Sequence, residues 1–399
     1  MGSIAGAPLA SLLRALLVSR AVASAAAVAI VVALGFGLLV PVLPLYARSF
    51  GVPATQVGLV VSAFALWRLL CDLPAGRLVG RLGAARATAL GAAIVACSSA
   101  AAGLAPSFPF LVLFRGLGGA GSALFSTGLL SYLLVAVPRE TLGRAMGVFQ
   151  SAFLLGSALG PSAGGLLAGL LGLRGPFFVY AGCCIAASAV ALRVLQDAVL
   201  TDAAAGGRPA ARALRALWRP NRVLVGALGG GFALWWLLSG FRFALVPLYA
   251  EERLGLDSAA IGLGLTVSAA TTLLLLWPAG LAADRLGRRT VGVPAFVGLA
   301  PATAALLLAE GLPGYLLANA LYGAVYGAAA VVPGALLGDA TPRSRAGELS
   351  GVSQLTSDLG SVLGPVAVGA LLDAAGYPAA IALAVAPAVA AAGAIATAR

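Results

Sequence analysis

Residues 74–83 read PAGRLVGRLG, and residues 278–287 read PAGLAADRLG, which is the same pattern displaced by 204 positions. The displacement is constant along the chain, so that Gly119, for example, recurs as Gly323. Because one register holds from about residue 51 to residue 369, helices and loops must keep nearly equal lengths in the two halves. Two homologous halves with a substrate site between them are an architecture of many secondary transporters.

The composition around this repeat is that of a membrane protein. Hydrophobic residues make up 61% of the 399 residues and charged residues only 10%, whereas a soluble domain carries roughly 25% charge. A membrane-crossing helix needs about 20 apolar residues. We therefore predict an all-α membrane protein with twelve transmembrane helices in two pseudo-symmetric six-helix bundles. The predicted spans are 21–46, 54–79, 87–105, 109–137, 145–172, 176–195, 222–249, 259–283, 290–309, 312–337, 346–372 and 376–397.

The arginines predict the orientation of these helices. All 25 basic residues are arginine, and the chain has no histidine. With the N-terminus inside, 19 arginines fall at cytoplasmic ends and only Arg48, Arg174 and Arg253 at external ends. The positive-inside rule then places both termini in the cytoplasm. The net charge of +12 is thus explained by topology rather than by nucleic-acid binding.

Residues 196–221 are expected to form a cytoplasmic linker between an N-terminal bundle, 1–195, and a C-terminal bundle, 222–399. Five arginines in or beside the linker recur at spacings of 4, 3, 4 and 3, which puts them on one helical face: Arg208, Arg212, Arg215, Arg219 and Arg222. This pattern is typical of an interfacial helix on an anionic leaflet. A solvated linker that obeys the positive-inside rule would give the same spacing.

Several function classes are not expected. The four cysteines lie in apolar segments and no histidine could complete a zinc site, so we predict no metal and no cofactor. An intramembrane enzyme is not expected, because it would need a nucleophile–base pair or a metal site within the membrane. Without lysine there is no phosphate-binding loop, so ATP does not drive the protein directly.

Charged residues inside the spans are the best candidates for a functional site, because each costs roughly 2.5–3.5 kcal/mol to insert. Five stand out: Arg68, Asp72, Arg115, Arg242 and Asp358. Arg68 and Asp72 are four residues apart and share one helix face. Arg68 and Asp358 lie at similar depths in their spans, about 11 and 12 residues from the cytoplasmic end.

The loop after the span 259–283 carries the motif GLAADRLGRR at 280–289. It resembles the signature of the major facilitator superfamily, and the chain is most similar to that family's twelve-helix drug:proton antiporters. The resemblance implies a cytoplasmic gate in which Asp284 binds the positive N-terminus of a facing helix near Gly143 to Gly147. The implied gating residues are Gly76, Arg77, Arg81, Gly83, Gly280, Asp284, Arg285, Gly287 and Arg288. In the N-terminal copy, Gly80 replaces the family's usual acidic residue, so the matching latch is not implied.

Two more motifs support the resemblance. Residues 115–121 match an Arg-x-x-x-Gly-x-Gly element that the family associates with proton transfer. Residues 156–165 match its antiporter motif, which is typical of exporters, through Gly156, Gly160, Pro161, Gly164 and Gly165. The glycines would let helices approach closely, and packing alone is the alternative interpretation.

In the family fold the spans 54–79 and 346–372 face each other. We therefore expect a contact between Arg68 and Asp358, with Asp72 competing for Arg68. Protonation of one of these two carboxylates would release Arg68 to bind the other carboxylate. A permanent structural ion pair is the alternative. The resemblance also places several residues around the substrate cavity: Arg115, Arg242, Asn319, Tyr322, Tyr326 and Trp235.

These features favour a secondary transporter of the inner (plasma) membrane, functional as a monomer, that exports small amphipathic or drug-like molecules in exchange for protons. Its partners would be the substrate, protons and the lipid bilayer. An importer, symporter or facilitator of a small organic anion, sugar or other metabolite is the alternative.

Overall fold

The computed structural model describes residues 20–195, 222–340 and 346–397. Within these ranges the chain is helical throughout, with no strand. Long apolar segments favour helices in a membrane because each helix satisfies its own backbone N–H and C=O groups. The expected linker 196–221, including most of its arginine stripe, lies outside the described residues.

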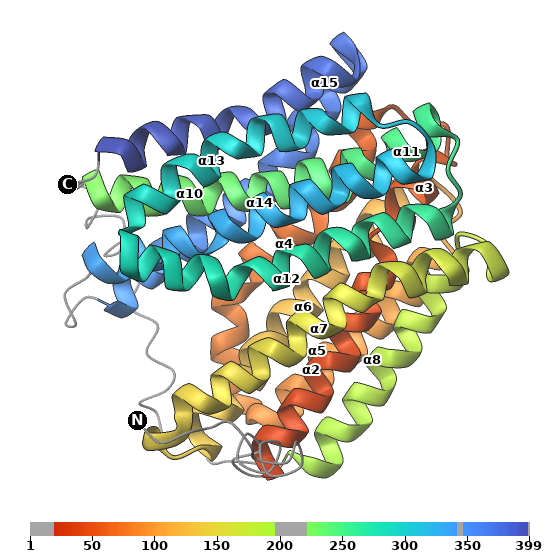
Figure 1. Cartoon of the computed structure of the whole chain (residues 1–399). Helices are drawn as coiled ribbons and strands as arrows, with labels where there is room; N and C mark the ends of the chain where they lie inside the picture. Colours follow the sequence, from red (N-terminus) through yellow and green to blue (C-terminus); the bar gives the residue numbers. More distant parts are fainter. Residues whose placement is uncertain (1–19, 196–221, 341–345, 398–399) are drawn as a thin grey trace, which may run out of the picture.

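In residues 20–195, the described part of the first half, there are six long helices and one short one (Figure 1). They are α2 (Arg20–Leu39), α3 (Val42–Arg48), α4 (Ala54–Leu82), α5 (Ala84–Gly103), α6 (Phe108–Ala136), α7 (Arg139–Leu171) and α8 (Gly175–Val194). The predicted span 21–46 is divided between α2 and α3, with Pro41 at the start of α3. The largest difference from the predicted spans is α7, which begins six residues early because its first turns are polar but helical.

The second half begins with a span built from three helical types. These are α10 (Arg222–Trp236), the π-helix η3 (Leu237–Leu245) and α11 (Val246–Leu254). The remaining elements are α12 (Ser258–Leu286), α13 (Arg288–Ala304), the short 3₁₀ helix η4 (Ala305–Leu308), α14 (Gly311–Ala340) and α15 (Ala346–Thr397).

The internal repeat is visible in the helix boundaries. Both ends of α4 and α12 differ by 204 positions, and α5 and α13 begin at Ala84 and Arg288, again 204 apart. Gly83 (φ 82°) and Gly287 (φ 97°) separate these helices, in a left-handed backbone region that only glycine enters easily. The expectation that both halves keep equal helix and loop lengths is confirmed for this part of the chain.

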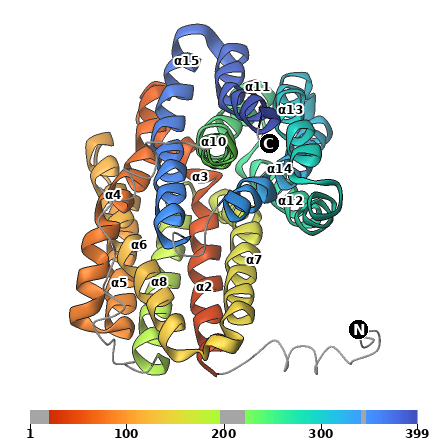
Figure 2. The same ribbon diagram turned by 90° about the vertical axis from the view of Figure 1, so that its left-hand side faces the viewer.

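The number of membrane crossings depends on α15. The described residues contain eleven helices long and apolar enough to cross a membrane, counting α15 once. Gly376 interrupts α15 with φ 79° and ψ −179°, so α15 consists of two helical segments. Figure 2 shows the chain reversing direction within α15. The predicted twelve spans require each of these segments to cross.

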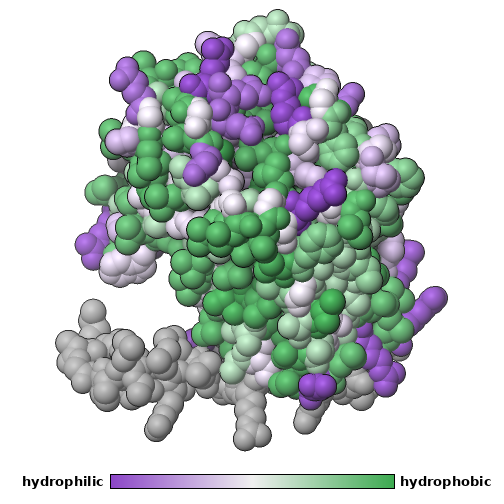
Figure 3. All heavy atoms as spheres, turned by 90° about the vertical axis from the view of Figure 1, so that its right-hand side faces the viewer, coloured by the Kyte–Doolittle hydropathy of each residue, from purple (hydrophilic) through white to green (hydrophobic). Residues whose placement is uncertain are grey.

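The outer surface is apolar, as a bilayer requires. Many large hydrophobic side chains are exposed, among them Leu70, Leu170, Leu274, Trp277 and Leu308. Hydrophobic residues cover most of the middle of the face in Figure 3, and hydrophilic residues gather mainly toward its upper part.

The two halves meet along two seams, where α4 packs on α15 and α7 packs on α12. The helices of both seams touch at the end of the molecule that holds α3, α11 and Gly376, which we call the closed end. Figure 1 shows α7 and α12 converging toward that end and diverging toward the opposite end, which we call the open end. α4 and α12 both begin at the closed end, so Gly83 and Gly287, which follow them, lie at the open end.

Glycine makes the seams possible. A Cβ at Gly58 would overlap the carbonyl oxygen of Pro365, and a Cβ at Gly262 would overlap that of Pro161. These two pairs are related by the repeat of 204. The same holds one turn away, where Gly369 lies against the Ala54 carbonyl and Gly165 against the Ser258 carbonyl. The seams therefore consist of backbone packed on backbone, and side chains at these glycines would separate the halves.

We predict that Gly58→Ala and Gly262→Ala each destabilise the purified protein by about 1–3 kcal/mol, the usual cost of overpacking. Thermal unfolding in detergent measures the effect. Gly229→Ala is the matched control, because a Cβ at Gly229 meets no atom within 4 Å. Equal melting temperatures for all three variants would contradict this account of the seams.

Candidate functional site

The motif at 156–165 contacts two different partners. Gly156, Gly160 and Gly164 recur every four residues on one face of α7, and each lies against the backbone of α2. Pro161 and Gly165 lie on the face that meets α12. The N–H of Ser162 donates to Thr266 Oγ1 at 3.0 Å across the same seam. The motif therefore binds α7 tightly to its own half and, through Pro161, Ser162 and Gly165, to the other half.

The three charges predicted to act together lie at the other seam. Arg68 and Asp72 are one turn apart on α4, and Asp358 lies on α15. None of them is ion-paired with a described residue, so the predicted Arg68–Asp358 contact is absent from this conformation. Asp358 accepts a hydrogen bond from Gln354 at 3.0 Å instead.

Arg68 and Asp358 do not contact each other because α4 and α15 separate before the seam reaches these residues. Between the described parts of α4 and α15, side-chain hydrogen bonds end with Ser62 Oγ donating to the Val362 carbonyl at 2.6 Å. The three charges lie beyond that bond, toward the open end. They still interact at longer range, since the Arg68 charge acts on both carboxylates. Arg68 Nε and Asp358 Oδ2 remain buried without a hydrogen-bond partner.

Arg115 lies on α6 and is only 5% exposed. It lines a cavity of about 40 Å³ between the halves, together with Phe36, Leu39, Val40, Leu43, Val61, Phe64 and Phe243. The guanidinium lies over the ring of Phe64, at 4.7 Å from the centroid. Arg115 therefore lies at a cavity between the halves, and its part in substrate binding stays a prediction.

Arg242 lies in the π-helix η3, next to Phe243 in the sequence, and is outside the set of residues that lines this cavity. Its Nη2 donates to the Leu265 carbonyl at 2.8 Å, and its Cζ lies 5.8 Å from the Phe243 centroid. A π-helix has a wider turn than an α-helix. It is rare, and it is frequently found at functional sites.

The other predicted cavity residues do not line this cavity in the present conformation. Asn319 is buried and its amide donates to the Tyr315 carbonyl on the same helix at 2.9 Å. Tyr322 and Tyr326 pack on each other with ring centroids 5.6 Å apart, inside the second half. Trp235 is 41% exposed on α10. Their predicted role in binding requires another conformation.

At the open end the predicted gate is not formed. Asp284 Oδ1 pairs with Arg288 at 2.6 Å, and Arg288 Nε lies 3.4 Å from Asp339 Oδ2 on α14. A Cβ at Gly143 or Gly147, the expected partners on α7, would meet no atom within 4 Å. Asp284 thus contacts its own half, because the two halves are apart at this end.

The flanking motif residues agree with an open gate. Arg77, Arg81 and Arg285 are exposed. A Cβ at Gly76 or Gly280 would meet no atom within 4 Å. Their expected part in a closed gate is therefore not visible in this conformation.

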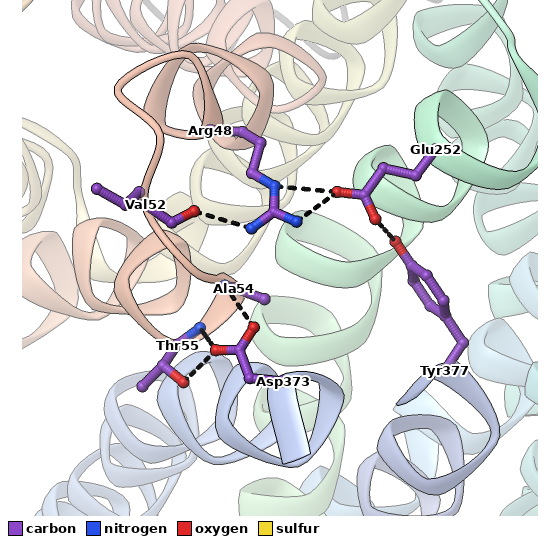
Figure 4. Close-up of polar contacts among 7 residues, drawn as sticks. All are labelled: Arg48, Val52, Ala54, Thr55, Glu252, Asp373 and Tyr377. Atoms are coloured by element: carbon purple, nitrogen blue, oxygen red, sulfur yellow. Dashed lines mark hydrogen bonds and ion pairs between the residues drawn. The ribbon is translucent and has the colours of Figure 1, made fainter. Parts of the chain in front are cut away.

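The closed end carries a polar latch that the sequence analysis missed (Figure 4). Asp373 on α15 reaches across to the first residues of α4. Its carboxylate accepts from Ala54 N at 2.8 Å, Thr55 N at 2.7 Å and Thr55 Oγ1 at 2.5 Å. Free N–H groups at a helix start attract a carboxylate. Pro53 precedes α4 and makes no side-chain cap, so the other half supplies it.

A second contact joins the halves beside this cap. Arg48 pairs with Glu252 at 3.0 Å and also donates to the Val52 carbonyl at 2.8 Å. The other Glu252 oxygen accepts from the Tyr377 hydroxyl at 2.7 Å. Arg48 and Glu252 are 204 positions apart, so the ion pair joins repeat-related residues. Opposite charges at repeat-related positions were the signal that could have identified it.

The described residues bring together no group of three or more potential metal ligands.

Comparison with known proteins gives a family. A model of the Major Facilitator Superfamily matches residues 25–258 and 232–398. The chloramphenicol resistance protein of Streptomyces lividans is 29% identical over 351 residues, covering 84% of this chain and 88% of that protein. Multidrug resistance protein 2 of Bacillus subtilis (strain 168) is 30% identical over 166 residues. The match with this Bacillus protein spans 42% of this chain and 41% of that protein.

Solved structures share the fold. A bacterial homolog of the human lysosomal transporter Spinster, in an inward-facing and unoccupied conformation, superposes with a TM-score of 0.76. It is 16% identical, over 94% of this chain and 93% of that one. The nucleoside transporter NupG also gives a TM-score of 0.76 at 12% identity, over 94% of this chain and 98% of that one.

We predict that Asp373→Asn shifts the protein toward opening of the closed end. An amide has one acceptor oxygen and no charge, so the trans cap loses about 1–2 kcal/mol, roughly a tenfold change in population. The measurement is the maleimide labelling rate of a single cysteine at Ser62, which is 3% exposed at the seam, in a cysteine-free background.

Glu310→Gln, an exposed acid in the turn before α14, is the control and should leave the labelling rate unchanged. Equal rates for Asp373→Asn and the unsubstituted background would show that the latch does not hold the halves together.

Proposed function

The chain belongs to the major facilitator superfamily, and we propose that it exports small amphipathic or drug-like molecules in exchange for protons by alternating access. One observation carries the proposal. Two repeat-related seams are closed at one end of the molecule, while the gate residues Asp284, Gly143 and Gly147 lie apart at the other. A central site reached from one side only is the geometry that alternating access needs.

The arginine distribution supports an orientation with both termini in the cytoplasm. In that orientation the closed end faces outward and the structure is an inward-facing state. The twelve spans then form two six-helix bundles, 1–195 and 222–399, joined by the cytoplasmic linker 196–221. The transporter lies in the inner (plasma) membrane and works as a monomer.

The gates alternate through the contacts already described. Closing the cytoplasmic end moves Asp284 from Arg288 toward the N-terminal turn of α7, whose helix dipole attracts the carboxylate. Opening the external end breaks the Asp373 cap and the Arg48–Glu252 pair. At the four glycines of the seams the halves meet backbone on backbone, and we infer that such contacts let the halves separate without withdrawing a side chain there.

Proton coupling depends on Arg68, Asp72 and Asp358. No histidine is present in the chain, so carboxylates are the available proton carriers. One arginine between two acids can neutralise only one of them at a time. Protonation of either carboxylate changes which acid Arg68 attracts, and the three lie on the seam that must move. The unpaired Arg68 Nε and Asp358 Oδ2 support such a rearrangement.

The relatives favour export. They include multidrug, chloramphenicol and quinolone resistance proteins. Structural neighbours include a nucleoside transporter, so the fold alone does not select the cargo. Import or facilitated passage of a metabolite remains the second candidate, favoured by the buried arginine in the cavity.

We predict that the purified protein, reconstituted in liposomes with a pH-sensitive dye, moves protons when a substrate is added. Asp358→Asn and Asp72→Asn should abolish the substrate-dependent proton flux, because neither amide binds a proton near neutral pH. Glu140→Gln, an exposed acid at the start of α7, should retain it. Full proton flux in both aspartate variants would exclude these carboxylates as proton carriers.

A further inference from the structure

Arg115 is a buried cation with nothing to neutralise it. Its side chain makes no hydrogen bond or ion pair with any described residue, and its buried Nε has no partner. A guanidinium carries five donors, and an unpaired charge in an apolar site is costly. A residue of this kind is retained where something binds to it.

Packing does not require this charge. The repeat-related position in the second half is Asn319, which is as deeply buried as Arg115. Its amide is satisfied by the Tyr315 carbonyl of its own helix. A neutral side chain therefore occupies the repeat-related position in the second half, so the fold does not need a charge at this place.

A second cation lies on the far side of the same aromatic cluster. Arg242 uses one nitrogen on the Leu265 carbonyl, and its buried Nε has no partner. Among the described residues, no carboxylate pairs with Arg115 or Arg242. The described acids inside the membrane, Asp72 and Asp358, interact with Arg68 instead. The charged residue that lines the cavity is therefore an unpaired cation, which favours an anionic group over a cationic one beside it.

Aromatic rings connect the two cations. Arg115 lies over Phe64, Phe64 contacts Phe36 at 5.7 Å between centroids, and Phe36 contacts Phe243 at 6.4 Å. Arg242 lies beside Phe243. Phe36 comes from α2, Phe64 from α4 and Phe243 from η3, so rings from both halves meet at the cavity. Tilted and edge-on rings at these separations are favourable pairs, and an inserted aromatic group would find similar partners.

We propose that the substrate is an aromatic organic anion, with its negative group on Arg115 and its ring among Phe36, Phe64 and Phe243. This inference rests on the proposed transport function and specifies its cargo. The present cavity of about 40 Å³ has room for water but not for such a molecule. Binding therefore requires the Phe243 side of the cluster to move away from Phe36 and Phe64, which couples occupancy to movement of the halves.

The test uses 2-naphthoate and its neutral isostere 2-naphthamide as probes of the detergent-purified full chain, with binding measured by calorimetry. The unsubstituted protein should bind the carboxylate about tenfold or more tightly than the amide, as a charge-assisted hydrogen bond implies. Arg115→Gln should remove this preference and Arg115→Lys should retain part of it. Arg174→Gln, an exposed arginine, should leave it unchanged.

Equal affinity for the two probes in the unsubstituted protein, or tighter binding of the amide, would overturn the proposal without the need for any variant. A carboxylate preference that survives in folded Arg115→Gln would also overturn it. Because binding in detergent needs no gradient, the two proposals fail separately. Anion-selective binding without proton flux in liposomes would contradict antiport alone, and proton flux driven only by cationic or neutral compounds would contradict the anion site alone.

Discussion

The close contact of backbone with backbone at Gly58 and Gly262 is the constraint on which the rest of this structure depends. Each glycine lies against a proline carbonyl of the opposite half, and the two contacts are related by the repeat. With no side chain at either position, the halves can touch at one end and enclose a small aromatic cavity beyond it. Membrane helices associate mainly through close packing, and these glycines allow that packing without a side chain between the two backbones.

The polar contacts break this symmetry. Asp257 caps its own helix α12 by accepting from Ala260 N at 2.8 Å, and that cap is independent of the other half. The corresponding start of α4 follows Pro53 and receives its cap from Asp373 across the seam. Separation of the closed end therefore costs one helix cap at the α4–α15 seam and none at the α7–α12 seam. The latch and the membrane carboxylates lie on this one seam, where a proton could influence opening.

The sequence predicted much of the fold because the lengths of the apolar runs and the 204-residue repeat can be recognised without knowing any contact in space. Helix boundaries agreed within a few residues except at the polar start of α7. The cost of burying a charge singled out Arg115 as a candidate, and its role stays a prediction. The latch was not, because Asp373 and Thr55 are 318 residues apart and nothing near either one indicates the other. The contact of Asp284 with α7 was predicted for a conformation in which this end is closed, whereas the end is open in the present conformation. A sequence specifies both states, whereas a single conformation shows only one set of contacts.

The measurement that tests this account most directly is a pair of spin-label distances in a cysteine-free background, in liposomes, with and without substrate and a pH gradient. Labels at Ser49 and Glu310 report on the closed end, and labels at Glu140 and Thr290 report on the open end. We expect opposite changes, with the first distance lengthening in the same fraction of molecules in which the second shortens. Changes of the same sign, or a fixed first distance during transport, would contradict alternation between the two ends.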